Sequence, residues 1–466
     1  MRTESDSLGP VQVPEEALWG AQTQRAVDNF PVSGLRQSAA YLVATALVKR
    51  AAAEVNVDLG MLDSTTGQAI VDAAVQIAEG SWHDQFVVDP FQAGAGTSHN
   101  MNANEVIANL ANEALGGTRG VYKPVHPNDH VNMAQSTNDV IPTVLRVAAA
   151  TETPNLVAAM GALVEVLNRK AEEFDRVLKP GRTHLQDAVP VRLGQEFAAY
   201  ARAVELDRQR ISRALEMVCR LGIGGTATGT GLNSHPEYHG RMVHRLAAVT
   251  GIPFTSAGDL FEPMQSAADM TDLSAALRTA AVTLTRIAND LRLLSSGPTT
   301  GFAEITLPAV QPGSSIMPGK VNPVMAEMLN MVCFHVMGND LTIMAAAQAG
   351  QLELNVMTPI IAYNLLQSIS ILANGVRLFT ERCVAGISAN ETRCRDLAEK
   401  SIGLATALNA YIGYRAAAQV AQEAMAREVP LRQVVLEHGY LSPEQLDRVL
   451  DAYAMAEPGI PGQNLE

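Results

Sequence analysis

Apolar residues recur at helical spacing along most of this chain, and in its central part they do so over long stretches. The longest periodic segments cover residues 143–179, 191–221, 262–296, 323–348 and 358–387, and Pro- and Gly-rich breaks separate them. A helix of thirty residues is about 45 Å long at the usual rise per residue. The pattern therefore predicts a mainly α protein built on an elongated bundle of about five long helices. Apolar stripes of this length exceed what one bundle buries, so we expect the bundles of several chains to associate.

Shorter patterns flank the central segments. Residues 1–40 are mixed in character and predict an irregular arm, followed by helices over 41–55 and 66–79 and a third from about Asn102. Beyond residue 390 the chain is more charged, and its patterns predict small helices over 397–412, 414–428, 431–438 and 442–453. These changes predict a mostly helical N-terminal domain (1–140), the long-helix bundle (141–391) and a small helical C-terminal domain (392–466).

Composition narrows the classes of fold and partner. Aromatic residues make up only 5% of the 466 residues, and Ala, Leu and Met, which favour helices, supply much of the 47% that is hydrophobic. This balance argues against an all-β sandwich or barrel. A net charge of −14 argues against nucleic acid as a partner, because phosphate backbones attract basic surfaces. The same charge repels an anionic substrate, so any site for one needs local positive potential.

Cysteine usage and the N-terminus bear on the compartment. The four cysteines stand singly in helical patterns without a CxxC pair, which is typical of buried, reduced thiols. The first residues are polar and acidic, unlike a signal peptide. No run of about 18 purely apolar residues occurs, so we expect no membrane partner. A soluble, cytoplasmic protein is the expectation.

The break that carries the most chemistry is QPGSSIMPGKVNPVMAE, residues 311–327. Gly313 permits unusual backbone angles, so the amides after it are expected to turn inward and form a nest for an anionic oxygen. Asn322 and Pro323 predict a helix N-cap and first turn, and the helix N-terminus adds partial positive charge beside Lys320. The stretch therefore predicts a site that binds a carboxylate and stabilises extra negative charge on it.

Two alternatives compete with this interpretation. A phosphate-binding Walker loop needs four residues between its glycines and a Ser or Thr after the lysine, but five residues separate Gly313 from Gly319 and Val321 follows Lys320. That alternative fails. An ordinary capped loop explains Asn322 and Pro323 but leaves the paired serines and Lys320 unexplained.

Three further polar breaks are candidates for ligand contacts. They are the glycine-rich stretch 89–100 with Thr97 and Ser98, the stretch 135–139 with Ser136, Thr137 and Asn138, and the stretch 181–187 with Thr183 and His184. Hydroxyls and amides in a row suit hydrogen bonds to a carboxylate. The same residue types also cap helices, so each stretch has a purely structural alternative.

Other motifs are weaker. His126, Asp129 and His130 have loose metal-like spacing without further ligands, and His235 and His239 are better interpreted as part of a solvated loop. The glycine-rich stretch 222–231 follows a helix and lacks the spacing of a dinucleotide-binding loop. We therefore expect no metal and no cofactor.

GSSIMPGKVNP, beginning at Gly313, resembles the signature loop of the fumarase/aspartase superfamily, and the resemblance extends from Trp19-Gly-Ala-Gln-Thr-Gln-Arg25 to Gly439-Tyr-Leu-Ser442. Members break a C–N or C–O bond in a small dicarboxylate substrate and release fumarate. The resemblance implies a homotetramer with a shared many-helix core, in which three different chains contribute the polar stretches of each active site.

The superfamily pattern also implies roles for individual residues. Ser314 corresponds to the general base, and His184, oriented by Glu327, lies next to the substrate. The positions that correspond to substrate binding are Thr97, Ser136, Thr137, Asn138, Thr183, Ser315, Lys320 and Asn322. All of them carry the residue that the pattern requires, which argues against a non-catalytic structural relative.

The branch within the superfamily rests on smaller differences. Residues 94–98, 136–138, 289–297 and 349–357 look more like the aspartase branch, which removes ammonia from L-aspartate. Class II fumarases, which remove water from L-malate, usually have Ser at position 137, Trp at position 293 and a different residue at position 357. Residues 18–25 and 317–320 are equally at home in fumarases. We expect an aspartase, with class II fumarase as the alternative.

Overall fold

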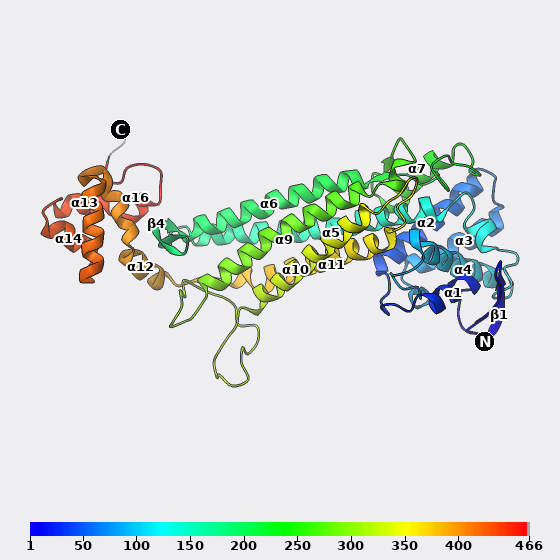
Figure 1. The fold of residues 1–466 in the computed structure, drawn as a ribbon, viewed down its shortest axis with the longest axis horizontal. Helices are drawn as coiled ribbons and strands as arrows, with labels where there is room; N and C mark the ends of the chain where they lie inside the picture. The colour runs from blue at the N-terminus through cyan, green and yellow to red at the C-terminus, as the bar shows by residue number, and fades with distance from the viewer. Residues whose placement is uncertain (464–466) are drawn as a thin grey trace. The chain divides into compact units, whose positions relative to one another are not determined.

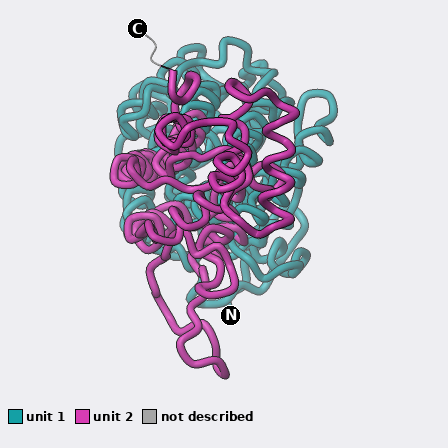
Figure 2. Tube along the Cα trace, turned by 90° about the vertical axis from the view of Figure 1, so that its left-hand side faces the viewer, with its two compact units in different colours: residues 1–158, 207–282, 332–374 teal, residues 159–206, 283–331, 375–466 magenta. Residues whose placement is uncertain are grey.

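The computed structural model describes residues 1–463, and helices dominate it (Figure 1). The chain forms two compact units (Figure 2). Unit 1 consists of residues 1–158, 207–282 and 332–374, and unit 2 of residues 159–206, 283–331 and 375–466. The mainly α, helical-bundle class predicted from apolar spacing is confirmed.

The long periodic segments are long helices. They are α5 (Thr137–Glu173), α6 (Leu193–Val218), α9 (Ala268–Leu294), α10 (Val324–Ala347) and α11 (Thr358–Arg382). Each of them has residues in both units. By length and composition alone, 137–173 and 358–386 resemble membrane-spanning helices, but the core helices of soluble proteins pass the same test.

The N-terminal region is more regular than the predicted irregular arm. β1 (Arg2–Asp6) and β2 (Gly9–Val13) form an antiparallel hairpin, and α1 (Ala21–Asn29) follows. The buried carboxylate of Glu105 accepts the backbone N–H groups of Gly20, Gln22 and Thr23. These are amides that the first turn of a helix leaves without partners, so a carboxylate from another helix caps α1 and fixes the Trp19–Arg25 motif.

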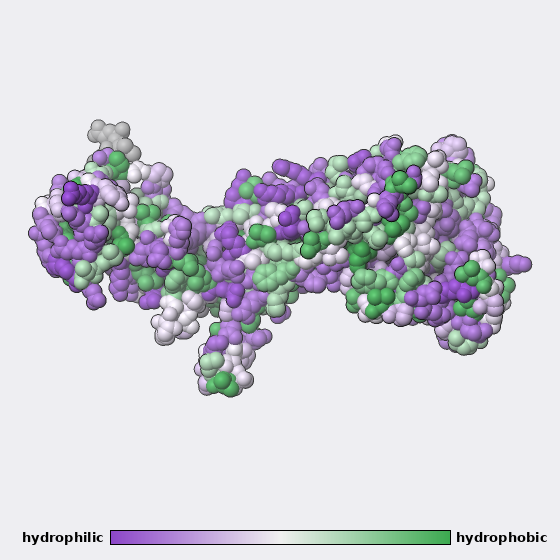
Figure 3. Space-filling view, viewed as in Figure 1, coloured by the Kyte–Doolittle hydropathy of each residue, from purple (hydrophilic) through white to green (hydrophobic). Residues whose placement is uncertain are grey.

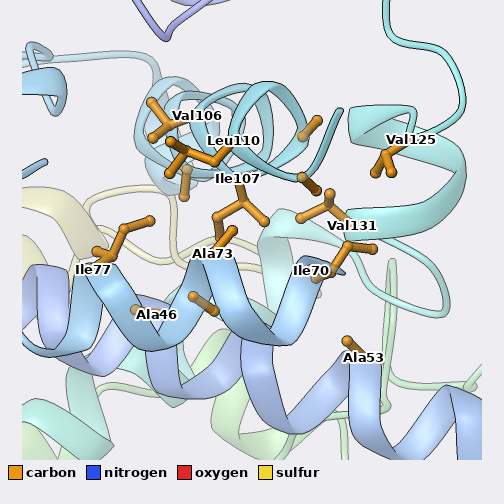
Figure 4. Close-up of a cluster of buried hydrophobic side chains, with 14 of the residues drawn as sticks. Ala46, Ala53, Ile70, Ala73, Ile77, Val106, Ile107, Leu110, Val125 and Val131 are labelled. Atoms are coloured by element: carbon orange, nitrogen blue, oxygen red, sulfur yellow. The ribbon is translucent and has the colours of Figure 1, made fainter. Parts of the chain in front are cut away.

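The core of this region lies between three helices (Figure 4). They are α2 (Ala39–Asp58), α3 (Ser64–Ala78) and α4 (Thr97–Ala114). Ile70 and Ile77 of α3 pack with Ile107 of α4, and alanines of α2 allow close approach. α4 starts at Thr97 rather than near Asn102 as predicted, because the short 3₁₀ turn η2 (Gly94–Gly96) leads directly into it.

The predicted helix to residue 179 ends early, and a hairpin replaces its last turn. β3 (Leu178–Thr183) pairs antiparallel with β4 (Gln186–Arg192), and the register shifts between Pro180 and Arg182. Proline has no N–H to donate to the hydrogen bonds between strands, so prolines in a segment argue against a strand. The prolines of this segment are the reason that its sequence did not predict a hairpin.

The remaining elements are short. They are η1 (His83–Gln85), the π-helical turn η3 (Pro127–Val131), β5 (Arg220–Leu221), α7 (Tyr238–Thr250), β6 (Thr255–Ser256), α8 (Glu262–Gln265), β7 (Ile305–Thr306), η4 (Val384–Gly386) and β8 (Ser388–Ala389). β7 pairs with β8, and β5 pairs with β6. His239 belongs to α7 rather than to a solvated loop, since its ring nitrogens contact the carbonyl oxygen of Ile223 at 2.6 Å and the hydroxyl of Ser256 at 2.7 Å.

The C-terminal residues form small helices around their own core. They are α12 (Glu391–Lys400), η5 (Ile402–Leu404), α13 (Ala405–Arg427), α14 (Leu431–Glu437), α15 (Pro443–Val449) and α16 (Ala452–Met455). The single helix predicted over 397–412 is wrong, because the chain turns at Ser401 between α12 and α13. Gly403 lies against Ala188, where a Cβ would be 2.0 Å from the carbonyl oxygen, so this turn requires glycine. A kink at Gly413, with φ of 78°, separates the two parts of α13.

Candidate active site

The segment between β7 and α10 forms a loop that closes on itself. The backbone N–H of Gly313 donates to the carbonyl oxygen of Lys320 at 2.8 Å, and the side-chain amide of Asn322 donates to the carbonyl oxygen of Gly313 at 2.7 Å. A Cβ on Gly313 would lie 2.6 Å from the Lys320 carbonyl oxygen. Glycine is therefore required at 313 for close approach rather than for the unusual backbone angles that we predicted. The left-handed position is Gly319, with φ of +80°.

Asn322 does not act as the predicted N-cap. Its side chain is committed to Gly313, and the carbonyl oxygen of Pro323 accepts the first helical bonds of α10 from Ala326 and Glu327. The helix thus begins one residue later than the Asn-Pro pattern predicted. Asn322 instead ties the loop's end to its beginning, which holds the residues between them in one closed turn.

The hydroxyl of Ser314 lies inside this turn. Its Oγ accepts the backbone N–H of Ile316 at 3.2 Å and that of Met317 at 3.0 Å. The predicted inward-facing amides therefore exist, but in this conformation they point at the serine oxygen. Two donors directed at one hydroxyl oxygen favour its negatively charged form. Ser315 and Lys320 are exposed on the same loop.

Asp139 organises the stretch with Ser136, Thr137 and Asn138, which are half-buried at the start of α5. Its carboxylate accepts the backbone N–H of Ser136 at 2.9 Å, and its other oxygen accepts those of Gly224 and Thr226, both at 2.9 Å. Burial raises the pKa of Asp139 to about 6, against the lowering effect of these donors. The glycine-rich stretch 222–231 thus receives a carboxylate from α5, and Asn138 also donates to the Ala227 carbonyl oxygen at 2.8 Å.

A second buried charge lies close behind Thr137. Lys49 of α2 is fully buried and donates to the side-chain oxygens of Asn132 at 3.0 Å and Gln135 at 2.9 Å. Burial lowers the pKa of Lys49 to about 7, although the negative charge of Asp139 opposes this shift. Asn100 of α4 completes the group by donating to Asn132 and to the Thr137 hydroxyl, each at 3.2 Å. Sequence reasoning missed Lys49, since a lysine in an apolar helix gives no sign of which side it faces.

Thr97 is the first residue of α4 and is exposed. The turn before it is fixed because the N–H of Ala95 donates to the carbonyl oxygen of Val356 at 2.7 Å. Ala95 and Gly96 both have positive φ, at 62° and 84°, so the chain reverses sharply before the helix begins. The result is a threonine hydroxyl at a helix N-terminus, where partial positive charge favours an anion.

Thr183 and His184 lie at the tip of the β3–β4 hairpin and are exposed. Thr183 pairs with Gln186, so His184 and Leu185 form a two-residue turn, with φ values of 55° and 61°. Such a turn usually carries Asn-Gly, and side chains larger than glycine are strained in it. Backbone strain of this kind clusters at functional sites, which supports a role for the tip.

The candidate residues fall into two sets. Unit 1 carries Thr97, Ser136, Thr137 and Asn138, whereas unit 2 carries Thr183, His184, Ser314, Ser315, Lys320, Asn322 and Glu327. Within residues 1–463, no hydrogen bond or ion pair joins His184 to Glu327 or to the 311–323 loop. The predicted orientation of His184 by Glu327 is therefore not formed inside one chain. The described part of the chain also holds no cluster of three or more side chains suited to a metal ion.

Known proteins are similar to this chain along most of its length. A family model described as lyase matches residues 9–338, and one described as the fumarase C C-terminus matches residues 404–457. An aspartate ammonia-lyase of Bacillus subtilis is 51% identical over 464 residues, covering 100% of this chain and 98% of the relative. A class II fumarate hydratase of Methylorubrum extorquens is 48% identical, covering 98% of this chain and 97% of the relative.

A solved structure agrees with these sequence relationships. The class II fumarase of Schistosoma mansoni superposes with a TM-score of 0.96 at 38% identity, covering 98% of this chain and 99% of that one. The matches extend over the whole fold and include every segment that carries a candidate residue. The chain is therefore a lyase and belongs to the fumarase/aspartase superfamily.

Proposed function

We propose that this protein is an aspartate ammonia-lyase, which converts L-aspartate reversibly to fumarate and ammonia. The similarity to relatives of that name supports the choice, and so does the ammonia-lyase character of residues 94–98 and 136–138. The observation that carries the chemistry is the pair of backbone donors on the Ser314 hydroxyl oxygen. The substrate class is a small dicarboxylate.

Ser314 is the general base in this proposal. A serine hydroxyl is a weak base in water, because its alkoxide is far less stable than the neutral hydroxyl. The N–H groups of Ile316 and Met317 stabilise the alkoxide, and they require no reorganisation when the proton moves. The alkoxide takes the proton from the carbon next to the β-carboxylate, and the proton stays on Oγ.

Proton removal creates an aci-carboxylate intermediate with a second negative charge on that carboxylate. Lys320 and the Ser315 hydroxyl are suited to hold it, since both come from the same loop. Asn322 can add the second N–H of its side-chain amide, because only one N–H is used in the bond to Gly313. Thr97, Ser136, Thr137, Asn138 and Thr183 are proposed to hydrogen-bond the substrate's carboxylates. Donors directed at developing charge are each typically worth about 3–4 kcal/mol in transition-state stabilisation. Collapse of the intermediate expels ammonia from the adjacent carbon, with His184 beside the substrate.

The active sites are proposed to be shared between the chains of a homotetramer. Phe334, Leu341 and Met344 lie on one side of α10 and are 57%, 63% and 46% exposed. Figure 3 shows hydrophobic side chains, in green, at the surface among hydrophilic ones. A helix that is apolar on several sides is normally buried, so we expect a second copy of the chain to pack against this exposed side of α10. In the assembly, a neighbouring chain's loop and Glu327 meet the His184 hairpin.

Class II fumarate hydratase is the second candidate. The relative from Methylorubrum extorquens supports it, and Thr137 differs from the usual fumarase serine by only one methyl group. The absorbance of fumarate formed from L-aspartate, compared with that from L-malate, decides between the two. Rapid turnover of aspartate supports the proposal, and turnover of malate alone overturns it. Activity on neither substrate would favour the third alternative, a non-catalytic structural relative of the family.

The proposal includes a cytoplasmic location and no membrane, nucleic-acid or cofactor partner. The acidic net charge supports the lack of nucleic acid. Fractionation of cells that express the protein, followed by detection in the soluble cytoplasmic fraction, tests the location.

A further inference from the structure

One fully buried carboxylate lies between the two segments of unit 2 that carry candidate catalytic residues. Glu304 has no exposed surface, and its two oxygens lie 2.8 Å from Arg182 Nη2 and 3.2 Å from Lys179 Nζ. Neither contact has hydrogen-bond geometry, so the attraction is mainly ionic. Both basic residues belong to β3, and Arg182 directly precedes Thr183 and His184.

Glu304 is itself held rigidly. Its backbone N–H donates to the Leu294 carbonyl oxygen at 2.9 Å, and its own carbonyl oxygen accepts the N–H of Asn390 at 2.9 Å. The guanidinium of Arg182 also lies over the ring of Phe302, 4.1 Å from its centroid. The hairpin is therefore fastened to the segment 302–304 by a charge pair and a cation–π contact.

That segment is also the root of the Ser314 loop. Glu304 is followed at once by β7 (Ile305–Thr306), whose pairing with β8 is the last strand contact before the loop. The same carboxylate thus fixes the strand that leads to His184 and the stem from which the Ser314 loop extends. This link exists within one chain, so it acts whichever copies meet at each site.

We propose that Glu304 is a positioning residue of the lyase reaction, acting through Arg182 on the His184 hairpin and through its own backbone on the Ser314 loop. The inference rests on the proposed function of those two segments. Buried carboxylates of this kind have a structural role in many proteins, and here that role extends to catalysis because both anchored segments end in reacting groups. A displacement of 1 Å at such groups lowers turnover about 10²-fold.

The charges around Glu304 balance in the wild-type protein. Lys179 also pairs with Glu196 at 2.7 Å, so two basic and two acidic groups form one network. Glu304→Gln keeps the size of the side chain but leaves one positive charge without a partner. The freed Arg182 is then expected to turn towards solvent and carry the hairpin tip with it.

The test compares the kinetics of Glu304→Gln with those of Asp269→Asn, using L-aspartate and L-malate as substrates. Asp269 is a matched control, because its carboxylate pairs with buried Arg146 at the same distance of 2.8 Å, within unit 1. We expect kcat to fall at least about 10-fold in Glu304→Gln, with a smaller change in KM, and to change less than about 2-fold in Asp269→Asn. An equal effect of both variants overturns the proposal, since it shows a general loss of stability.

Trypsin supplies a readout that does not depend on activity. Lys320 is exposed in the loop, so release of the stem is expected to speed cleavage after Lys320 several-fold in Glu304→Gln but not in Asp269→Asn. Unchanged cleavage together with unchanged kcat rejects the positioning role. If the wild-type protein turns over neither substrate, the proposed function is rejected instead. Faster cleavage of Glu304→Gln would then still show that Glu304 anchors the stem of the loop.

A second variant covers the case in which Glu304→Gln does not fold. Arg182→Gln leaves the Lys179–Glu304 pair intact and is expected to lower kcat in the same direction. If the two residues act through one contact, the double variant Glu304→Gln/Arg182→Gln loses no more activity than the worse single variant. Losses that multiply in the double variant contradict the proposal.

Discussion

The backbone N–H of Met317 points at the hydroxyl oxygen of Ser314 from 3.0 Å away. The N–H of Ile316 joins it at 3.2 Å, so two consecutive backbone amides donate to a single side-chain oxygen. In the proposed mechanism, the loop that presents the serine also supplies the groups that stabilise its alkoxide. This arrangement lies within one chain, whereas the proposed substrate contacts involve several chains.

Replacing Ser314 with alanine is expected to lower kcat by at least about 10², because the general base is lost. Initial rates of fumarate formation measure the effect. The assembly should survive, since Ser314 makes only local bonds, and gel filtration checks this. A near-normal kcat in an intact assembly would reject serine as the base.

Lys320→Ala is expected mainly to raise KM for L-aspartate. A positive charge on a carboxylate acts on bound substrate and on the transition state alike, so its loss weakens binding uniformly. Steady-state kinetics over a wide substrate range separate the two parameters. A collapsed kcat at unchanged KM would show instead that the lysine acts only on the intermediate.

Sharing of sites between chains predicts that inactive variants restore one another. Asn138→Ala removes a group of unit 1, and Ser314→Ala removes one of unit 2. When the two variants are unfolded together and refolded, some mixed assemblies should contain sites with neither defect. Activity of the mixture well above the sum of the separately refolded variants supports sharing, and simple addition of the two speaks against it.

The left-handed turn at the hairpin tip gives a stability prediction. Leu185 has φ of 61° and is 64% exposed, so Leu185→Gly is expected to relieve strain and stabilise the protein by up to about 1 kcal/mol. Thermal unfolding measures the change in Tm. Leu232 is a control, being 70% exposed without positive φ, and Leu232→Gly should not raise the Tm. A lower Tm for Leu185→Gly would mean that its side chain is covered in the assembly.

Lys49 predicts the direction of a pH dependence. Its pKa in the folded chain is lowered to about 7 by burial, and that of an unfolded lysine is near 10.5. Between these values the unfolded state binds more protons, so the contribution of Lys49 to stability rises with pH from about 7 to about 10. We expect the free energy of unfolding of the wild type to increase relative to Lys49→Met across this window. Urea unfolding at several pH values tests the sign, and a relative decrease contradicts it.

Periodicity alone sufficed to predict the long helices, because each must keep an apolar side against others over many turns. Periodicity did not predict the two hairpins, β1–β2 and β3–β4. In β3 and β4, Pro180 faces Pro190, and two prolines within a ladder argue against strands when read locally. Their pairing depends on contacts with residues far along the chain, which no short window contains. The division into domains at residues 140 and 391 stays a prediction.

The candidate site was predicted largely from the resemblance, and the roles of its residues stay predictions. Local reasoning identified the inward amides of the loop but assigned the wrong purposes to Gly313 and Asn322, because each is decided by a contact across the loop. The buried charges of Lys49, Asp139 and Glu304 gave no signal of their function. The role of each charge depends on the residues packed around it, and these are distant in the sequence.

The interleaved course of the chain has a consequence for synthesis. Unit 1 contains residues 1–158, 207–282 and 332–374, so the ribosome must pass residue 374 before its last piece emerges. The third segment of unit 2 begins only at residue 375. A message cut short before residue 374 therefore yields neither unit complete, and unit 2 is still unfinished when the last segment of unit 1 has been made.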